Sequence, residues 1–75
     1  MSTLASLNLG KGGKILKLPS GIPAMTRLRE LGLLPGTLVK LIRRAPMGDP
    51  LEISVRGSLL SLRKSEAEMI EVEPV

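Results

Sequence analysis

The chain has 75 residues with 11 Lys and Arg against 7 Asp and Glu, a net charge of +4, and no His, Cys or aromatic residue. This length gives room for one small core, and the absence of cysteine excludes disulfides and thiolate zinc sites. The core must be aliphatic, with little apolar material left for a deep pocket. We therefore expect a single domain over residues 1–75, without repeats or linkers.

The sequence gives no sign of a membrane or export segment. No run approaches the roughly 20 apolar residues that span a bilayer, and residues 1–9 have neither a basic region nor a long apolar region of a signal peptide. We expect a mature cytoplasmic protein that does not insert into a membrane. The modest positive charge fits solubility alone, or weak attraction to nucleic acid, acidic proteins or anionic headgroups.

The first elements in chain order are a strand and a helix. Residues 14–18 form a short strand candidate, entered through glycines and closed by the turn sequence of residues 19–21. Residues 23–31 then show helical spacing, with Pro23 suited to the first turn and Gly32 to the position after the end. The apolar face of this helix carries Ala24, Met25, Leu28 and Leu31.

The second half of the chain reads as strands joined by turns. Residues 34–37 predict a type II turn, with Pro35 and Gly36 at its centre. A strand over residues 38–44 follows, whose mixed pattern suggests cover on both faces, and residues 45–50 form a loop. Residues 51–56 alternate cleanly and turn at 57–58 into a second hairpin strand with Leu60 and Leu62. Residues 63–68 suit a helical turn or loop, before a last short strand over residues 70–73.

Five short strands with one short helix between the first and second predict an all-β fold, and a small barrel, because closing the sheet removes exposed edges. The residues that we expect to be largely buried in its core are Leu16, Leu28, Leu31, Val39, Leu41, Ile53, Val55, Leu60, Leu62, Ile70 and Val72.

An ordered set of motifs resembles the FeoA family, small cytosolic components of bacterial ferrous iron uptake. It begins with residues 27–37 (RLRELGLLPGT) and 43–53 (RRAPMGDPLEI) and continues through residues 55–57 (VRG), 60–63 (LSLR) and 70–72 (IEV). The resemblance covers the chain from about residue 7 onward. Met47 departs from the leucine expected there, a swap that preserves side-chain volume.

The resemblance implies that this five-stranded barrel is SH3-like and that it acts beside FeoB, a membrane permease with a cytosolic GTP-binding domain. We expect an accessory protein that binds the cytosolic part of FeoB and modulates transport, with self-association left open. A similar domain also forms the C-terminal part of metal-dependent repressors of the diphtheria-toxin-repressor type. This chain has no room for their DNA-binding half, which favours the free-standing role.

No combination of residues supports catalysis. His and Cys are absent, and no serine has a candidate base. Gly10, Gly12 and Gly13 do not complete a phosphate-binding loop. We expect no enzyme activity and no cofactor. The carboxylates at Asp49, Glu52, Glu66, Glu68, Glu71 and Glu73 are expected to be solvated.

Transition-metal binding is a label attached to the family as a whole, and we expect no specific iron site in this chain. Without His or Cys, an Fe(II) site would need carboxylates or methionines alone, which suit this ion poorly. The four methionines, Met1, Met25, Met47 and Met69, are dispersed along the sequence and read as packing residues.

The alternative function is that of a small basic barrel that binds RNA or another partner outside transport. Such nucleic-acid modules commonly stack bases on aromatic side chains, which this chain lacks. Its basic residues also occur in scattered pairs. We therefore expect a protein partner and no nucleic acid.

The candidate partner-binding residues come from the helix, the turn after it and the 45–50 loop. Leu33 and Leu34 follow the helix and are expected to leave an exposed apolar contact, although both could instead cap the barrel. Arg27 and Arg29 would form a basic rim that steers an acidic surface. The remaining candidates, in the loop, are Pro46, Met47 and Asp49.

Overall fold

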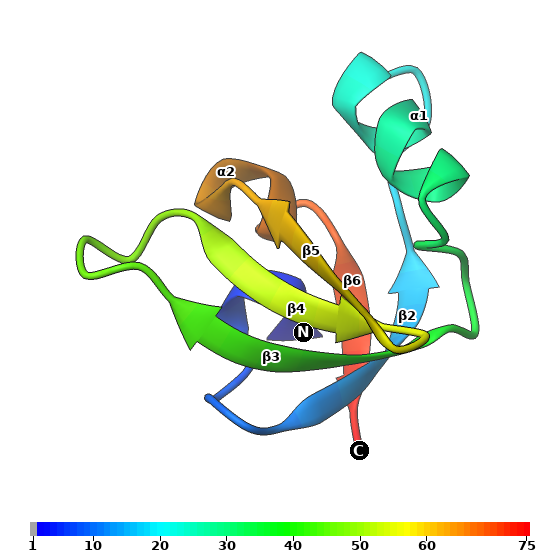
Figure 1. Ribbon diagram of the computed structural model, residues 1–75. Helices are drawn as coiled ribbons and strands as arrows, with labels where there is room; N and C mark the ends of the chain where they lie inside the picture. Colours follow the sequence, from blue (N-terminus) through cyan, green and yellow to red (C-terminus); the bar gives the residue numbers. More distant parts are fainter. Residues whose placement is uncertain (1) are drawn as a thin grey trace.

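Six strands, all antiparallel, form one sheet in the order β1-β6-β2-β3-β4-β5 (Figure 1). The computed structural model describes residues 2–75. The strands are β1 Ser2–Thr3, β2 Gly12–Lys17, β3 Leu38–Arg44, β4 Leu51–Val55, β5 Ser58–Leu62 and β6 Glu71–Pro74. The helices are a 3-10 turn η1 Leu4–Ser6, an α-helix α1 Pro23–Glu30 and a short helix α2 Lys64–Ala67.

The mostly β architecture is as expected, but the predicted closed, five-stranded barrel is wrong. The sheet has six strands and is open, because β5 at one end and β1 at the other each pair on one side only within residues 2–75. The extra strand is β1, whose two residues carry no alternating pattern. The helix therefore lies between the second and third strands. Helices and loops supply the cover that closure would have given.

A bulge in β2 explains why the expectation of a buried Leu16 is wrong. The pairing with β6 shifts register between Ile15 and Lys17, so Leu16 is an extra residue on its strand. It is 49% exposed, whereas Ile15 and Leu18 on either side are buried. The bulge reverses the inward-outward alternation, which is why the simple period of two selected the wrong leucine.

Helix α1 begins at Pro23, as predicted, and ends at Glu30, one residue earlier than predicted. Its buried side chains are Met25 and Leu28. Leu31 has the helical spacing but sits at the C-terminal cap, where the chain turns away, and it is 51% exposed. The expectation that Leu31 belongs to the core is therefore wrong.

The turn between α1 and β3 is built as predicted. Gly36 has a φ of 91°, and the amide of Thr37 donates to the carbonyl of Leu34 over 3.0 Å. The amide of Gly36 donates in turn to the carbonyl of Ile15 over 2.7 Å, which ties this turn to β2. The positive φ makes glycine the favoured residue at position 36.

Strand β3 buries only one face, which contradicts the expectation that it is covered on both. Val39 and Leu41 point into the core, whereas Leu38 and Ile42 are 62% and 43% exposed. A second bulge, between Leu41 and Arg43, places Ile42 outward together with its neighbour. The mixed apolar pattern thus reflects exposed apolar side chains on the outer face of the strand.

The β4–β5 hairpin follows the predicted alternation, with Ile53 and Val55 buried and Leu60 half-buried. Its two-residue turn lies one residue earlier than predicted, at Arg56 with φ 51° and Gly57 with φ 82°, the positive pair that a type I′ turn requires. This turn fixes the register, which runs without interruption from Val55 opposite Ser58 to Leu51 opposite Leu62.

The core collects apolar side chains from strands, helices and the N-terminal segment. Its buried members are Leu4, Leu7, Ile15, Leu18, Met25, Leu28, Leu33, Val39, Leu41, Leu51, Ile53, Val55, Leu62, Ala67, Ile70 and Val72. The N-terminal segment is held by Arg44, whose Nη2 donates to the carbonyls of Ala5 at 3.0 Å and Leu7 at 2.6 Å. Within residues 2–75, no helix is long and apolar enough to cross a membrane.

We expect Ile53→Ala to lower the free energy of unfolding by about 2–4 kcal/mol, because Ile53 is completely buried at the centre of the sheet and its truncation leaves a cavity. The matched control is Leu59→Ala in the next strand, where the side chain is 65% exposed and the loss should stay within about 0.5 kcal/mol. Urea denaturation followed by circular dichroism measures both. Equal losses in the two variants would contradict the burial described for this sheet.

Candidate functional site

The structure distributes the seven candidate partner-binding residues over three surface regions and the interior. Arg27 and Asp49 line a charged cleft at the end of β5, and Leu34 lines an apolar groove at the other end of that strand. Pro46 and Met47 lie in the β3–β4 loop and line neither concavity. Leu33 and Arg29 are engaged within the fold. The candidates therefore do not form one continuous surface.

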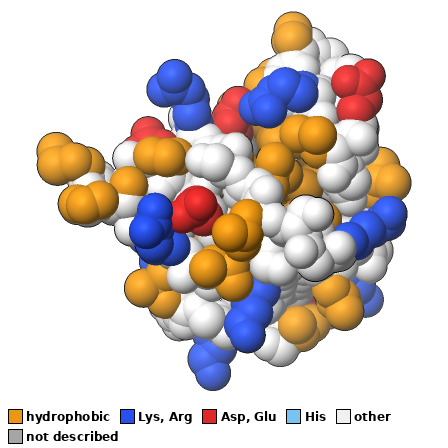
Figure 2. Space-filling model, in the orientation of Figure 1, with side chains coloured by type: hydrophobic (Ala, Val, Ile, Leu, Met, Phe, Trp, Pro, Cys, Tyr) orange, Lys and Arg blue, Asp and Glu red, His pale blue; other side chains and the backbone are white. Residues whose placement is uncertain are grey.

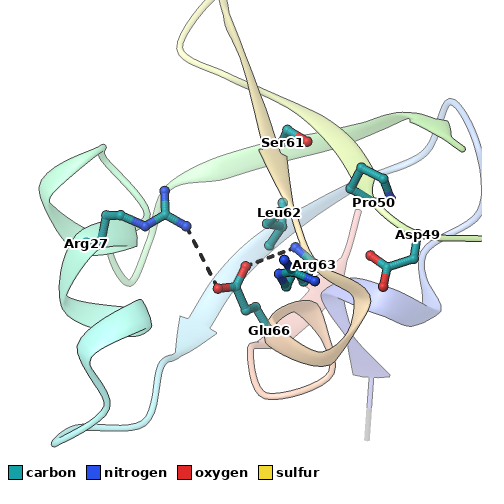
Figure 3. Close-up of a pocket in the computed structure, with 7 residues that line it drawn as sticks. All are labelled: Arg27, Asp49, Pro50, Ser61, Leu62, Arg63 and Glu66. Atoms are coloured by element: carbon teal, nitrogen blue, oxygen red, sulfur yellow. Dashed lines mark hydrogen bonds and ion pairs between the residues drawn. The ribbon is translucent and has the colours of Figure 1, made fainter.

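The charged cleft has a volume of about 410 Å³ and lies where α1, the β3–β4 loop, β5 and α2 approach one another (Figure 3). Its lining residues are Arg27, Asp49, Pro50, Ser61, Leu62, Arg63 and Glu66. Opposite charges thus face the same space, and the end of a β-strand forms part of the wall.

Two carboxylates in the charged cleft organise its backbone. Glu66 Oε1 accepts from the amide of Arg63 over 2.9 Å, and Asp49 Oδ1 accepts from the amide of Lys64 over 3.0 Å. These bonds satisfy amide groups at the start of α2, which have no partner within so short a helix. Asp49 and Glu66 therefore have a structural use, and Asp49 also links the β3–β4 loop to α2.

Arg27 makes only a loose ion pair in the charged cleft. Its Nη2 lies 3.8 Å from Glu66 Oε2, and its side chain is 55% exposed (Figure 3). The Glu66 side chain is only 14% exposed, but the distance is long and the guanidinium is open to solvent, so the pair contributes little to stability. The guanidinium can therefore turn to another carboxylate at small cost.

The apolar groove has a volume of about 600 Å³ and is lined by Leu34, Pro35, Gly36, Thr37, Leu38 and Arg56. Leu34 is 41% exposed and Leu38 is 62% exposed. Thr37 lies between them in the sequence and is buried, and its backbone is hydrogen-bonded to Leu34 and Ile15. The one charged group at this groove is Arg56, from the β4–β5 turn.

The β3–β4 loop projects from the body of the molecule and carries hydrophobic side chains at its tip (Figures 1 and 2). Met47 is 92% exposed and Pro46 is exposed beside it. Such an exposed methionine adds nothing to the core. The loop is anchored at its base by the amide of Ala45, which donates to the carbonyl of Pro50 over 3.0 Å.

Leu33 and Arg29 do not present the contacts that the sequence suggested. Leu33 is 0% exposed, so the expectation of an exposed apolar contact there is wrong. The backbone places it inside because the chain turns back after Gly32, which has a φ of 109°. Arg29 is half-buried, and its Nη2 donates to the carbonyls of Leu18 at 3.0 Å and Pro19 at 2.6 Å. It holds α1 against the segment that leads into it.

No group of three or more acidic, His or Cys side chains in residues 2–75 is arranged to hold a metal ion. The acidic residues are instead spread over ion pairs, such as Arg43 Nε with Glu52 Oε1 at 2.8 Å and Lys14 Nζ with Glu73 Oε1 at 3.5 Å. The surface offers concavities of mixed charge and apolar character, which suit a polypeptide better than a small reacting molecule.

Sequence reasoning missed the residues that complete the two concavities. In the sequence, Arg63 belongs to one of the scattered basic pairs, and Glu66 is predicted to be a solvated carboxylate. Arg56 and Leu38 are interpreted only as strand residues. The structure places the first two in the charged cleft and the other two in the apolar groove. The spacing of Arg63 and Glu66, three residues apart, was the available signal, because a glutamate at this position commonly bonds the amide that opens a helix. Their convergence with Arg27 depends on tertiary packing.

Comparison with known proteins gives a family match over nearly the whole chain. A model described as the FeoA domain matches residues 2–74. The chain is 37% identical to a FeoA protein from Chlorobium tepidum, with a TM-score of 0.90 over 99% of this chain and 70% of that one.

Two further solved structures agree with this match. An iron(II) transport protein A from Clostridium thermocellum is 32% identical, with a TM-score of 0.92 over 99% of this chain and 46% of that chain. A FeoA from Stenotrophomonas maltophilia, described as an SH3 domain protein complexed with zinc, is 31% identical, with a TM-score of 0.82 over 97% and 91% of the two chains. This chain thus spans about half the length of one relative and most of the others.

We expect Arg29→Gln to destabilise the fold by about 1–3 kcal/mol, because it removes charged donor groups from two backbone carbonyls. Arg27→Gln in the same helix is the matched control, and its loose surface pair predicts a loss below about 1 kcal/mol. Thermal and urea denaturation compare the two variants. A larger loss for Arg27→Gln would show that the described anchoring is incorrect.

We expect the chain to show no tight stoichiometric Fe(II) binding, because the described residues offer no cluster of suitable ligands. Anaerobic titration calorimetry measures this directly, and Mg(II) competition separates selective from general cation binding. A submicromolar one-to-one site that survives Mg(II) would overturn the ligand argument. The purified chain should also leave GTP and ATP unhydrolysed.

Proposed function

The chain belongs to the FeoA domain family, which is linked to ferrous iron transport, and from that premise we propose that it is an accessory protein that binds the cytosolic part of the FeoB permease and modulates transport. The resemblance noted in the sequence is thereby confirmed. The fold is SH3-like, as the related Stenotrophomonas structure is described, although its sheet is open. The family is not a known family of enzymes.

The observation that carries the binding role is the apolar groove beside β3. Leu34 and Leu38 are 41% and 62% exposed on either side of a buried residue, and both line this one concavity. Apolar side chains gathered in a concavity, rather than scattered singly, are typical of interaction sites. This groove therefore supports a protein partner.

Basic groups at the groove and at the charged cleft favour a partner with an acidic surface. Arg56 lines the groove, and Arg27 is exposed at the charged cleft. Exposed charges of one sign chiefly raise the rate of encounter and set orientation, whereas the buried apolar contact slows dissociation. The permease would be modulated either by a bias on its GTP-binding domain or by a more stable assembly, and the groove is compatible with both.

We expect Leu34→Ser to weaken binding to the purified cytosolic GTP-binding part of the permease by 1 kcal/mol or more, in the range of about 1–2 kcal/mol for an interface anchor. The melting temperature should stay nearly unchanged, because the side chain is partly exposed in the free chain. Titration calorimetry gives the affinity, and calorimetric scanning gives the stability.

The matched variant is Leu33→Ser, at the adjacent and completely buried position. It should lower the melting temperature strongly, since it places a hydroxyl in the core. Equal loss of stability in both variants would assign Leu34 a structural role. An unchanged affinity for Leu34→Ser would remove the apolar groove from the interface and direct attention to Met47 in the β3–β4 loop.

A further inference from the structure

Strand β5 is an edge strand with an unprotected outer side. It is the last strand of the sheet and pairs only with β4. Edge strands in native proteins are commonly blunted by a charged residue, a proline or a bulge. The sequence of β5, residues 58–62, contains none of these, and its pairing shows no register shift. The opposite edge, β1, is only two residues long.

The register shows which backbone groups of β5 face outward. The type I′ turn makes Val55 and Ser58 a closing pair that exchanges hydrogen bonds, and such pairs alternate along an antiparallel ladder. Leu60 and Leu62 therefore bond to β4, whereas the amides and carbonyls of Leu59 and Ser61 point away from it. No hydrogen bond within residues 2–75 engages these outward groups.

The two surface concavities lie at opposite ends of this edge strand. Arg56, two residues before the start of β5, lines the apolar groove, and Ser61, Leu62 and Arg63 at the end of the strand line the charged cleft. A five-residue strand spans about 17 Å, so an extended segment laid along the edge would reach from one concavity to the other. Leu59, which is 65% exposed, lies on the way.

We propose that the free edge of β5 accepts an extended, acidic segment of another polypeptide as an added strand. Outward amides and carbonyls at Leu59 and Ser61 supply the hydrogen bonds of this strand addition. Arg56 at one end and Arg63 at the other form no ion pair within the described residues, and Arg27 is only loosely paired. These three guanidinium groups select carboxylates in the incoming segment.

A second copy of this chain fits the edge less well than an acidic segment. In a symmetric antiparallel pairing centred on Leu60, Arg56 of one copy would lie opposite Lys64 of the other, at both ends of the interface. Like charges placed opposite each other on paired strands are destabilising. The net charge of +4 adds a general repulsion between copies.

The test titrates a capped peptide of alternating glutamate and valine, seven residues long, into the isotope-labelled full chain. We expect amide resonances of residues 59–62 to shift and hydrogen exchange at Leu59 and Ser61 to slow by about tenfold or more as their amides become bonded. The same peptide with lysine in place of glutamate should cause neither effect. Equal binding of both peptides, or shifts confined to other strands, would overturn the proposal.

Two sets of variants separate the backbone and charge contributions. Ser61→Pro removes an outward amide without removing a bond to β4, so it should abolish the exchange protection at Leu59 while the melting temperature changes little. Arg63→Glu should weaken peptide binding at least about fivefold, whereas Lys11→Glu, which makes the same charge change far from β5, should not.

If Ser61→Pro unfolds the chain, a synthetic chain N-methylated at Ser61 makes the same deletion with less backbone restraint. Retained binding in either form, or an Arg63→Glu effect no larger than that of Lys11→Glu, would refute strand addition. Sedimentation of the free chain completes the test, because dimers that protect the Leu59 amide without peptide would assign the edge to a second copy. None of these measurements involves the permease, so they stand or fall independently of the proposed function.

Discussion

The structure depends on covering an aliphatic core with too few strands to surround it. Without aromatic residues or disulfides, the chain relies on many small apolar side chains packed together. The open sheet cannot enclose them, so helices and turns provide the rest of the cover. Leu4 from η1, Leu28 from α1 and Ala67 from α2 each reach complete burial from a different element. If any one of these three helices were lost, the core side chains beneath it would be exposed to solvent, because no strand covers that side of the core.

Two arginines make this arrangement of separate covers possible. Arg44 donates to two carbonyls of the N-terminal segment, and Arg29 donates to two carbonyls before α1. In both cases a charged side chain from one element donates to backbone carbonyls of a short helical turn or a connecting segment elsewhere in the chain. Some basic residues that could suggest a binding surface in the sequence, here Arg29 and Arg44, thus stabilise the fold by hydrogen bonds to backbone carbonyls.

Local patterns were sufficient for most of the fold. Alternation located β4 and β5, and turn residues located the bend at Gly36, because these depend on neighbours in sequence. The errors at Leu16 and Leu31 arose where a bulge and a helix cap interrupted the period. The open sheet and the charged cleft were beyond the sequence pattern, since both depend on how distant segments meet. The family resemblance predicted the SH3-like fold class, but it did not predict that the sheet would stay open.

The place of β6 between β1 and β2 has a consequence for biosynthesis. Strand β6 is translated last of the six strands, yet within residues 2–75 it is the only strand that β1 pairs with, and it brings Val72 into the core beside the buried Ile70. At about 5–20 residues per second, the chain spends several seconds with its N-terminal segment translated but without that partner. The native core therefore forms only after β6 has been translated, and the leucines of the N-terminal segment stay accessible to chaperones until then.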